Sequence, residues 1–152
     1  MADSHKNFAY STVATAPSPA SSGTSLVVAA GQGALFPAVP FNATVWPTGV
    51  APISSNAEIV RVTNIATDTL TITRAQESTS ARTVIVGDQI AACVTAKTLT
   101  DVETLLPATG SGSPEGAVTA SPGAIYLDTA GDALWIKKTG AATNTGWLQL
   151  IG

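Results

Sequence analysis

Charged and aromatic residues are scarce in this chain of 152 residues. Charged side chains make up 11% of it and aromatics 5%, whereas charged residues are about a quarter of an average soluble protein. Small neutral residues, above all Ala and Thr, take their place, and Thr suits a pleated, half-exposed surface. Because a surface with so few charges causes little electrostatic repulsion between copies, we expect an oligomer or a lattice partner. A secreted or thermostable monomer is the alternative.

Histidine and cysteine occur once each, which excludes several kinds of site. His5 lies in a polar N-terminal segment, so it cannot complete a catalytic triad on a rigid scaffold. Cys93 cannot form an internal disulfide and, with one His in the chain, cannot anchor a zinc site; we expect a buried, inert thiol. Asp128 and Asp132 flank one turn, where bonding to the local backbone is favoured over calcium binding. We therefore predict a protein that is not an enzyme, with no catalytic residues, cofactor or metal.

Basic clusters and long apolar runs are also missing. The net charge is -3 and the seven Lys and Arg residues are scattered, so we expect no nucleic-acid partner. No apolar stretch reaches the ~18 residues that a membrane span needs, and no secretory signal is visible at the N-terminus. These features predict a protein made in a cytoplasm, with no membrane partner.

Short β-branched segments between Gly and Pro residues predict strands in the first two thirds of the chain. The clearest pair is a hairpin of residues 57–65 and 69–74, in which Leu70 and Ile72 face a core and the intervening threonines face out. The other predicted strands are residues 8–13, 25–30, 43–46, 83–86 and 89–95.

The hydrophobic period changes at residues 98–106. Leu99, Val102 and Leu106 have helical spacing there, Thr100 and Glu103 form a possible capping box, and a proline follows, so we predict one short helix. The next segment, residues 107–116, is rich in Gly, Ser and Pro and predicts a flexible linker.

Three short strands are predicted after the linker, at residues 124–128, 133–138 and 147–151. A three-stranded sheet of this size buries too little apolar area to fold alone. We therefore expect it to pack against the same segment of other subunits in a closed cyclic oligomer, rather than against the first domain. The predicted oligomer-interface residues are Tyr126, Trp135, Ile136 and Trp147.

These segments together predict an all-β fold. The expected N-terminal domain is a β-sandwich or a barrel-like sheet with one short helix, followed by a small three-stranded antiparallel meander. The predicted boundaries are residues 1–7 for an N-terminal arm, 8–106 for the β-rich domain, 107–116 for the linker and 117–152 for the meander. We expect the polar arm to be ordered only if a neighbour holds it.

Two stretches resemble segments of bacteriophage virion proteins. The first is Thr69-Leu70-Thr71-Ile72-Thr73-Arg74-Ala75-Gln76-Glu77, followed by Thr79, Ala81, Arg82, Gly87 and Asp88; it is similar to a segment of head fibres, decoration proteins and tail fibres. That segment usually has Gly after the Glu, where this chain has Ser78, so the turn could differ in backbone geometry. The second stretch is similar to the trimeric meander of phage fibre proteins, and the matching residues are Gly112 to Gly116, Pro122, Gly123, Tyr126, Asp128, Gly131, Trp135, Lys137, Gly140, Gly146 and Trp147.

The resemblance implies an N-terminal domain that docks to the virion and a C-terminal trimerisation unit. The first hypothesis is therefore a capsid decoration or head-fibre protein at the virion surface, a homotrimer that binds the major capsid protein and projects outward. The alternative is a short tail-fibre or receptor-binding protein that recognises host surface glycans through Trp135 and Trp147. A third hypothesis, a glycan-degrading spike, would need Asp and Glu residues from several subunits to converge.

Overall fold

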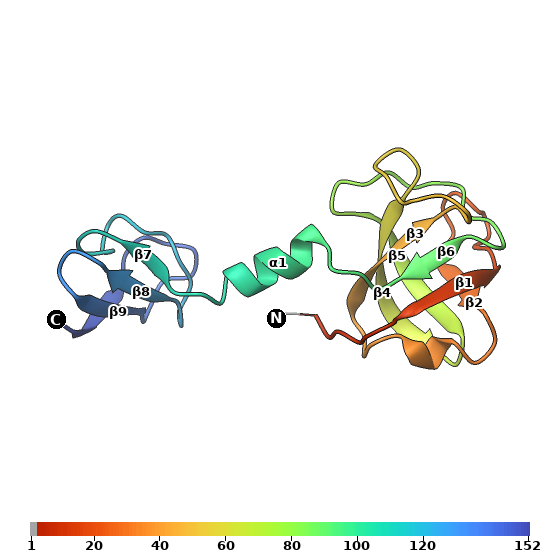
Figure 1. The fold of residues 1–152 in the computed structure, drawn as a ribbon. Helices are drawn as coiled ribbons and strands as arrows, with labels where there is room; N and C mark the ends of the chain where they lie inside the picture. The colour runs from red at the N-terminus through yellow and green to blue at the C-terminus, as the bar shows by residue number, and fades with distance from the viewer. Residues whose placement is uncertain (1–2) are drawn as a thin grey trace. The chain divides into compact units, whose positions relative to one another are not determined.

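The chain divides into two compact units, with the boundary between Leu99 and Thr100. The structure is a computed structural model, and it describes residues 3–152. Both units consist mainly of strands (Figure 1), so the prediction of an all-β fold is confirmed.

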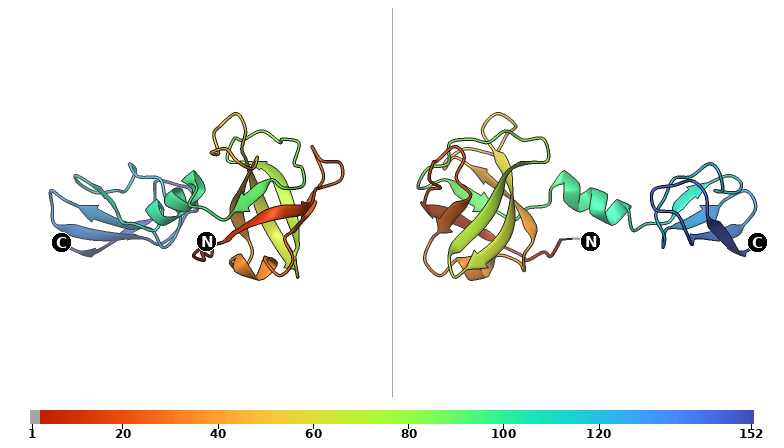
Figure 2. Two further views of the ribbon diagram at one scale, coloured as in Figure 1. Left: turned by 45° about the vertical axis from the view of Figure 1, so that its right-hand side comes forward. Right: turned by 180° about the vertical axis from the view of Figure 1, so that it is seen from behind.

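The first unit is a closed, six-stranded antiparallel barrel (Figures 1 and 2). Around the barrel the strands follow the order β1-β2-β5-β4-β3-β6, and β6 pairs back onto β1. The sequence left a sandwich and a barrel open, and the return pairing of β6 makes it a barrel. The strand bounds are Tyr10–Thr15 (β1), Ser25–Val28 (β2), Phe41–Trp46 (β3), Glu58–Ala66 (β4), Thr69–Gln76 (β5) and Gln89–Ala91 (β6).

The barrel interior is filled by alternate side chains from every strand. Leu70 and Ile72 of β5 are buried while Thr71 and Thr73 are exposed, as the hairpin prediction required. Phe36 stacks on Phe41 with ring centroids 5.9 Å apart. The fully buried aliphatic residues are Val13, Leu26, Val28, Val45, Val60, Val62, Leu70, Val84 and Ile90. This packed interior explains why a chain with few aromatics folds: branched aliphatics fill a narrow barrel.

The segment after the hairpin differs from the prediction. Residues 83–86 form a loop instead of a strand, although Val84 is fully buried in the core. The loop is held because the Asp88 carboxylate accepts hydrogen bonds from Arg82 and from the Ile85 N–H. The prediction of a buried Cys93 is also wrong, because β6 ends at Ala91 and the chain then leaves the barrel with the thiol exposed.

The N-terminal segment is held by the barrel. Arg61 pairs with the Asp3 carboxylate, with Nη2 to Oδ1 at 2.8 Å, and the Lys6 ammonium donates to the Ala34 carbonyl at 2.5 Å. The arm was predicted to be ordered only where a neighbour holds it. For residues 3–7 the neighbour is this chain's own barrel.

Helix α1 comprises Ala96–Glu103, two to three residues earlier than predicted. Thr100 and Glu103 do not cap it; at its N-terminus the Lys97 N–H donates to the Glu77 carboxylate at 2.9 Å, and the Thr95 N–H donates to Thr98 Oγ1 at 3.3 Å. No residue of the helix is buried.

The second unit contains a four-stranded sheet in the order β10-β9-β8-β7. The bounds are Ala108–Gly110 (β7), Ile125–Asp128 (β8), Ala133–Lys137 (β9) and Trp147–Ile151 (β10). The last three strands form the predicted antiparallel meander, and β7 adds a strand parallel to β8. Residues 107–116 are therefore part of the folded unit and not a free linker, because Ala108 to Gly110 find backbone partners on Tyr126 to Asp128.

Candidate functional site

The stretch of residues 69–88 contributes Arg74 to the most buried ion pair of the barrel. The Glu58 carboxylate accepts hydrogen bonds from Nε and Nη2 of Arg74 at 2.8 and 2.6 Å. It also accepts the backbone N–H groups of Ala75 and Arg82 at 2.8 and 3.0 Å. Arg74 in turn donates to the carbonyls of Ala20, Gly23 and Arg82. The pair therefore fastens two loops to the end of the β4–β5 hairpin.

The ionised form of Glu58 is stabilised in place. Burial alone would raise its pKa, but the hydrogen bonds from Arg74 and from the N–H groups of Arg82 and Ala75 outweigh burial, so the pKa lies below its ordinary value. A buried carboxylate with all these donors is a structural group, since its oxygens are already occupied.

The other polar residues of this stretch act in the same way. Glu77 accepts hydrogen bonds from the side-chain amide of Asn42 at 2.6 Å and from the Lys97 N–H at the start of α1. Arg82 pairs with Asp88, whose side chain is almost fully buried. Ser78, at the position where the resemblance led us to expect a different turn geometry, adopts φ of 61°. The turn thus keeps the left-handed backbone that favours glycine, despite the substitution.

The stretch of residues 112–147 ties loops to the sheet of the second unit. The Glu115 carboxylate accepts the N–H groups of Gly146 and Trp147, the latter at 2.8 Å. Asp128 accepts the N–H groups of Gly112, Ala130 and Gly131 at 2.7 to 3.1 Å. The N–H groups that face each carboxylate hold the pKa of Glu115 and of Asp128 below the ordinary range. The expected backbone role of Asp128 is therefore confirmed.

Lys137 is buried inside this small unit. Its ammonium group donates to Thr143 Oγ1 at 3.1 Å and to the Thr145 carbonyl, and it lies 5.6 Å from the centroid of the Trp147 ring. Buried ammonium groups need such partners. The inner face of the sheet is therefore built around a lysine and a tryptophan.

The four predicted interface residues do not share one face. The strand register pairs Tyr126 with Trp135, and Lys137 with Trp147, on the inner side. Tyr126 and Trp147 are buried there, with ring centroids 6.1 Å apart, and the indole N–H of Trp147 donates to the Val118 carbonyl at 3.0 Å. Only Ile136 belongs to the opposite, outer side.

The outer side of the sheet is aliphatic. Ile125 pairs with Ile136, Leu127 with Leu134, and Leu148 with Ile136 across neighbouring strands. Ile151, beyond an irregularity in β10, pairs with Leu134. We call these six residues the outer aliphatic face. Sequence reasoning missed this face, although strict alternation within β8 and β9 would have revealed it.

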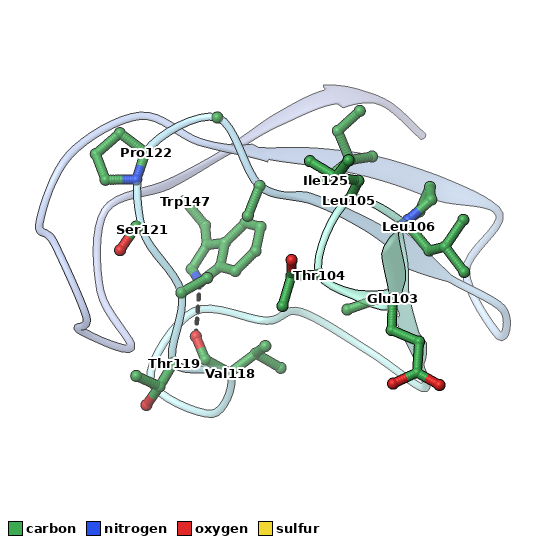
Figure 3. Close-up of a pocket in the computed structure, with 15 residues that line it drawn as sticks. Glu103, Thr104, Leu105, Leu106, Val118, Thr119, Ser121, Pro122, Ile125 and Trp147 are labelled. Carbon is green, nitrogen blue, oxygen red and sulfur yellow. Dashed lines mark hydrogen bonds between the residues drawn. The ribbon is translucent and has the colours of Figure 1, made fainter. Parts of the chain in front are cut away.

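A groove of about 720 Å³ opens beside this sheet (Figure 3). Leu105, Leu106 and Ile125 line it together with Trp147, whose hydrogen bond to Val118 is drawn in the close-up. Leu105 and Leu106 are exposed. The groove extends the apolar surface of the unit past the edge of the outer aliphatic face, because Ile125 belongs to both.

No group of His, Cys, Asp and Glu among residues 3–152 is arranged to hold a metal ion. Within the same residues, no helix has the length and apolar character of a membrane span. No family model and no curated protein matches the chain.

Proposed function

We propose that this chain is a structural component of a bacteriophage particle, a capsid decoration or head-fibre protein with no enzymatic activity. In this proposal the N-terminal barrel binds the major capsid protein at the virion surface. The C-terminal unit projects outward and associates with the same unit of two other copies.

The observation that carries the proposal is the position of the residues behind the resemblance. Arg74, Glu77 and Arg82 in the first stretch, and Glu115 and Asp128 in the second, hold loops to strands in their own unit. The likeness to phage segments therefore involves residues that determine local structure, and not composition alone. Their carboxylates and guanidinium groups already have partners, which supports a structural role over a chemical one.

The alternative proposal, a tail fibre that binds host glycans through Trp135 and Trp147, has weaker support. Stacking on a sugar needs an exposed ring face, whereas Trp147 is 8% exposed and its indole N–H is occupied. Trp135 is half-buried. Glycan-array binding by the purified chain that disappears in a folded Trp135→Ala variant would favour this alternative.

Cryo-electron microscopy of the phage that encodes the chain tests the main proposal. We expect density for the barrel on the outer surface of the capsid, together with labelling of the capsid by gold-conjugated antibodies to the chain. Density or label confined to the tail tip would refute the decoration role. Absence of the chain from purified particles would refute the virion role altogether.

A further inference from the structure

The C-terminal sheet is built with its charges inside and its aliphatic residues outside. The only charged residues in its strands, Asp128 and Lys137, both point to the inner side, where Lys137 is 1% exposed. On the other side Ile125, Leu127 and Leu148 are 42%, 39% and 44% exposed. A sheet with one solvated face normally has the reverse arrangement.

This inversion indicates that the outer aliphatic face is covered in the working protein. Contiguous apolar patches on soluble proteins mark interaction sites. The unit keeps Lys137 buried by means of two oxygen acceptors and the Trp147 ring. Four of the six side chains of the outer aliphatic face are exposed, namely Ile125, Leu127, Leu148 and Ile151. A covering partner would remove these side chains from water, which is the main driving force for association.

We propose that other copies of this chain cover the outer aliphatic face, each presenting the same face. None of the six residues of this face is charged, so the face cannot form ion pairs with a charged partner. Identical faces, by contrast, can meet around a symmetry axis without burying any charge. This inference rests on the self-association in the proposed function and identifies the surface through which the copies meet.

Helix α1 provides a second, independent reason to choose a copy as the partner. Leu99 and Val102 lie three residues apart on the helix, at the spacing of a coiled-coil seam, and both are exposed; Leu106, which follows the end of the helix, is exposed as well. A helix of eight residues with no buried side chain is not stable alone in water. The same helix of a neighbouring copy would cover these side chains.

The test uses the full chain and compares its mass in solution with that of two variants. In Ile136→Thr/Leu148→Thr the altered residues are register partners on β9 and β10, and Thr keeps the strand propensity. The second variant, Leu127→Lys, places like charges opposite each other where copies meet. The matched control, Ile85→Thr/Val86→Thr, removes two exposed aliphatics from the barrel loop.

We expect three times the 15.2 kDa chain mass for the wild type and the control, and the single-chain mass for both face variants. Circular dichroism and tryptophan fluorescence check that each variant is folded, and Leu127→Lys keeps the test valid should the double variant unfold. Addition of salt should partly restore the oligomer of Leu127→Lys, because screening weakens repulsion between copies.

Two outcomes would overturn the inference in different ways. Oligomers that persist in both folded face variants would show that copies meet elsewhere, and the virion proposal would still stand. A wild type that is monomeric at micromolar concentration yet present on phage particles would show that another virion protein covers the face. Absence from particles, by contrast, refutes the proposed function without bearing on the oligomer.

Discussion

Replacement of Glu58 by Gln should destabilise the barrel strongly. The substitution keeps the size of the side chain but removes the charge that faces the Arg74 guanidinium. Because each carboxylate oxygen accepts two of the four hydrogen bonds at 2.6 to 3.0 Å, the new NH2 group also faces two donors. Removal of one partner of a buried ion pair costs about 3–5 kcal/mol, because the remaining charge stays buried and unpaired. The free energy of unfolding should fall by that amount. The equilibrium constant for unfolding should therefore rise by roughly two to four orders of magnitude.

Hydrogen exchange measured by mass spectrometry is the appropriate assay, since the two units can unfold separately. The amides of β4, which includes the fully buried Val60 and Val62, report the opening of the barrel alone. The matched control is Glu103→Gln, the same chemical change at an exposed residue, which should alter stability by less than about 0.5 kcal/mol. A loss of less than about 1 kcal/mol in Glu58→Gln would refute the assigned role of the carboxylate.

Four further predictions follow from the same structure. Because the folded-state pKa of Glu58 is below its ordinary value of 4.5, the stability that the carboxylate contributes is complete above that pH and is lost as the pH falls through the folded pKa; acid titration should show this loss in the wild type and a smaller one in Glu58→Gln. Leu70→Ala should lower barrel stability by about 2–5 kcal/mol and Thr71→Ala by less than about 0.5, and equal effects in urea titrations would contradict the register. Ser78→Gly should raise the free energy of unfolding of the barrel by up to about 1 kcal/mol, because φ of 61° disfavours residues other than glycine, and a thermal melt should show a higher melting temperature. Trp147→Ala should unfold the C-terminal unit, with a loss of about 3–5 kcal/mol, and a native-like near-ultraviolet spectrum would argue against its place in the core.

The strands were predictable where alternation and chain punctuation agreed. The 57–65 and 69–74 hairpin follows from residue type alone, whereas β3 begins at Phe41, two residues before the predicted strand of residues 43–46. The Gly/Ser-rich segment was misread because its composition is typical of a linker, whereas its structure depends on distant partners. Strand β7 pairs with β8, and the Glu115 carboxylate accepts hydrogen bonds from the N–H groups of Gly146 and Trp147. Partners 18 to 32 residues away leave no local signal.

The structure divides the four predicted interface residues between the two faces of the sheet for a related reason. Large aromatic side chains are common at interfaces, so Tyr126 and Trp147 were chosen by residue type. In a unit with so little core, the same rings are needed inside, over the stem and ammonium group of Lys137. The less conspicuous Ile and Leu residues are left outside. Burial of a lysine could not be foreseen without the Thr143 and Thr145 oxygen atoms that accept its hydrogen bonds.

The three-residue strand β6 determines when the barrel can form during synthesis. Strand β6 pairs with β1, where Ala91 lies opposite Tyr10, and with β3, where Ala91 lies opposite Thr44. Neither pairing can form before this short segment has been synthesised. Until residue 91 has left the ribosome, the preceding strands form an open sheet with unpaired edges. The barrel should therefore close while the last third of the chain is still being translated, before its C-terminal sheet is complete enough to meet another subunit.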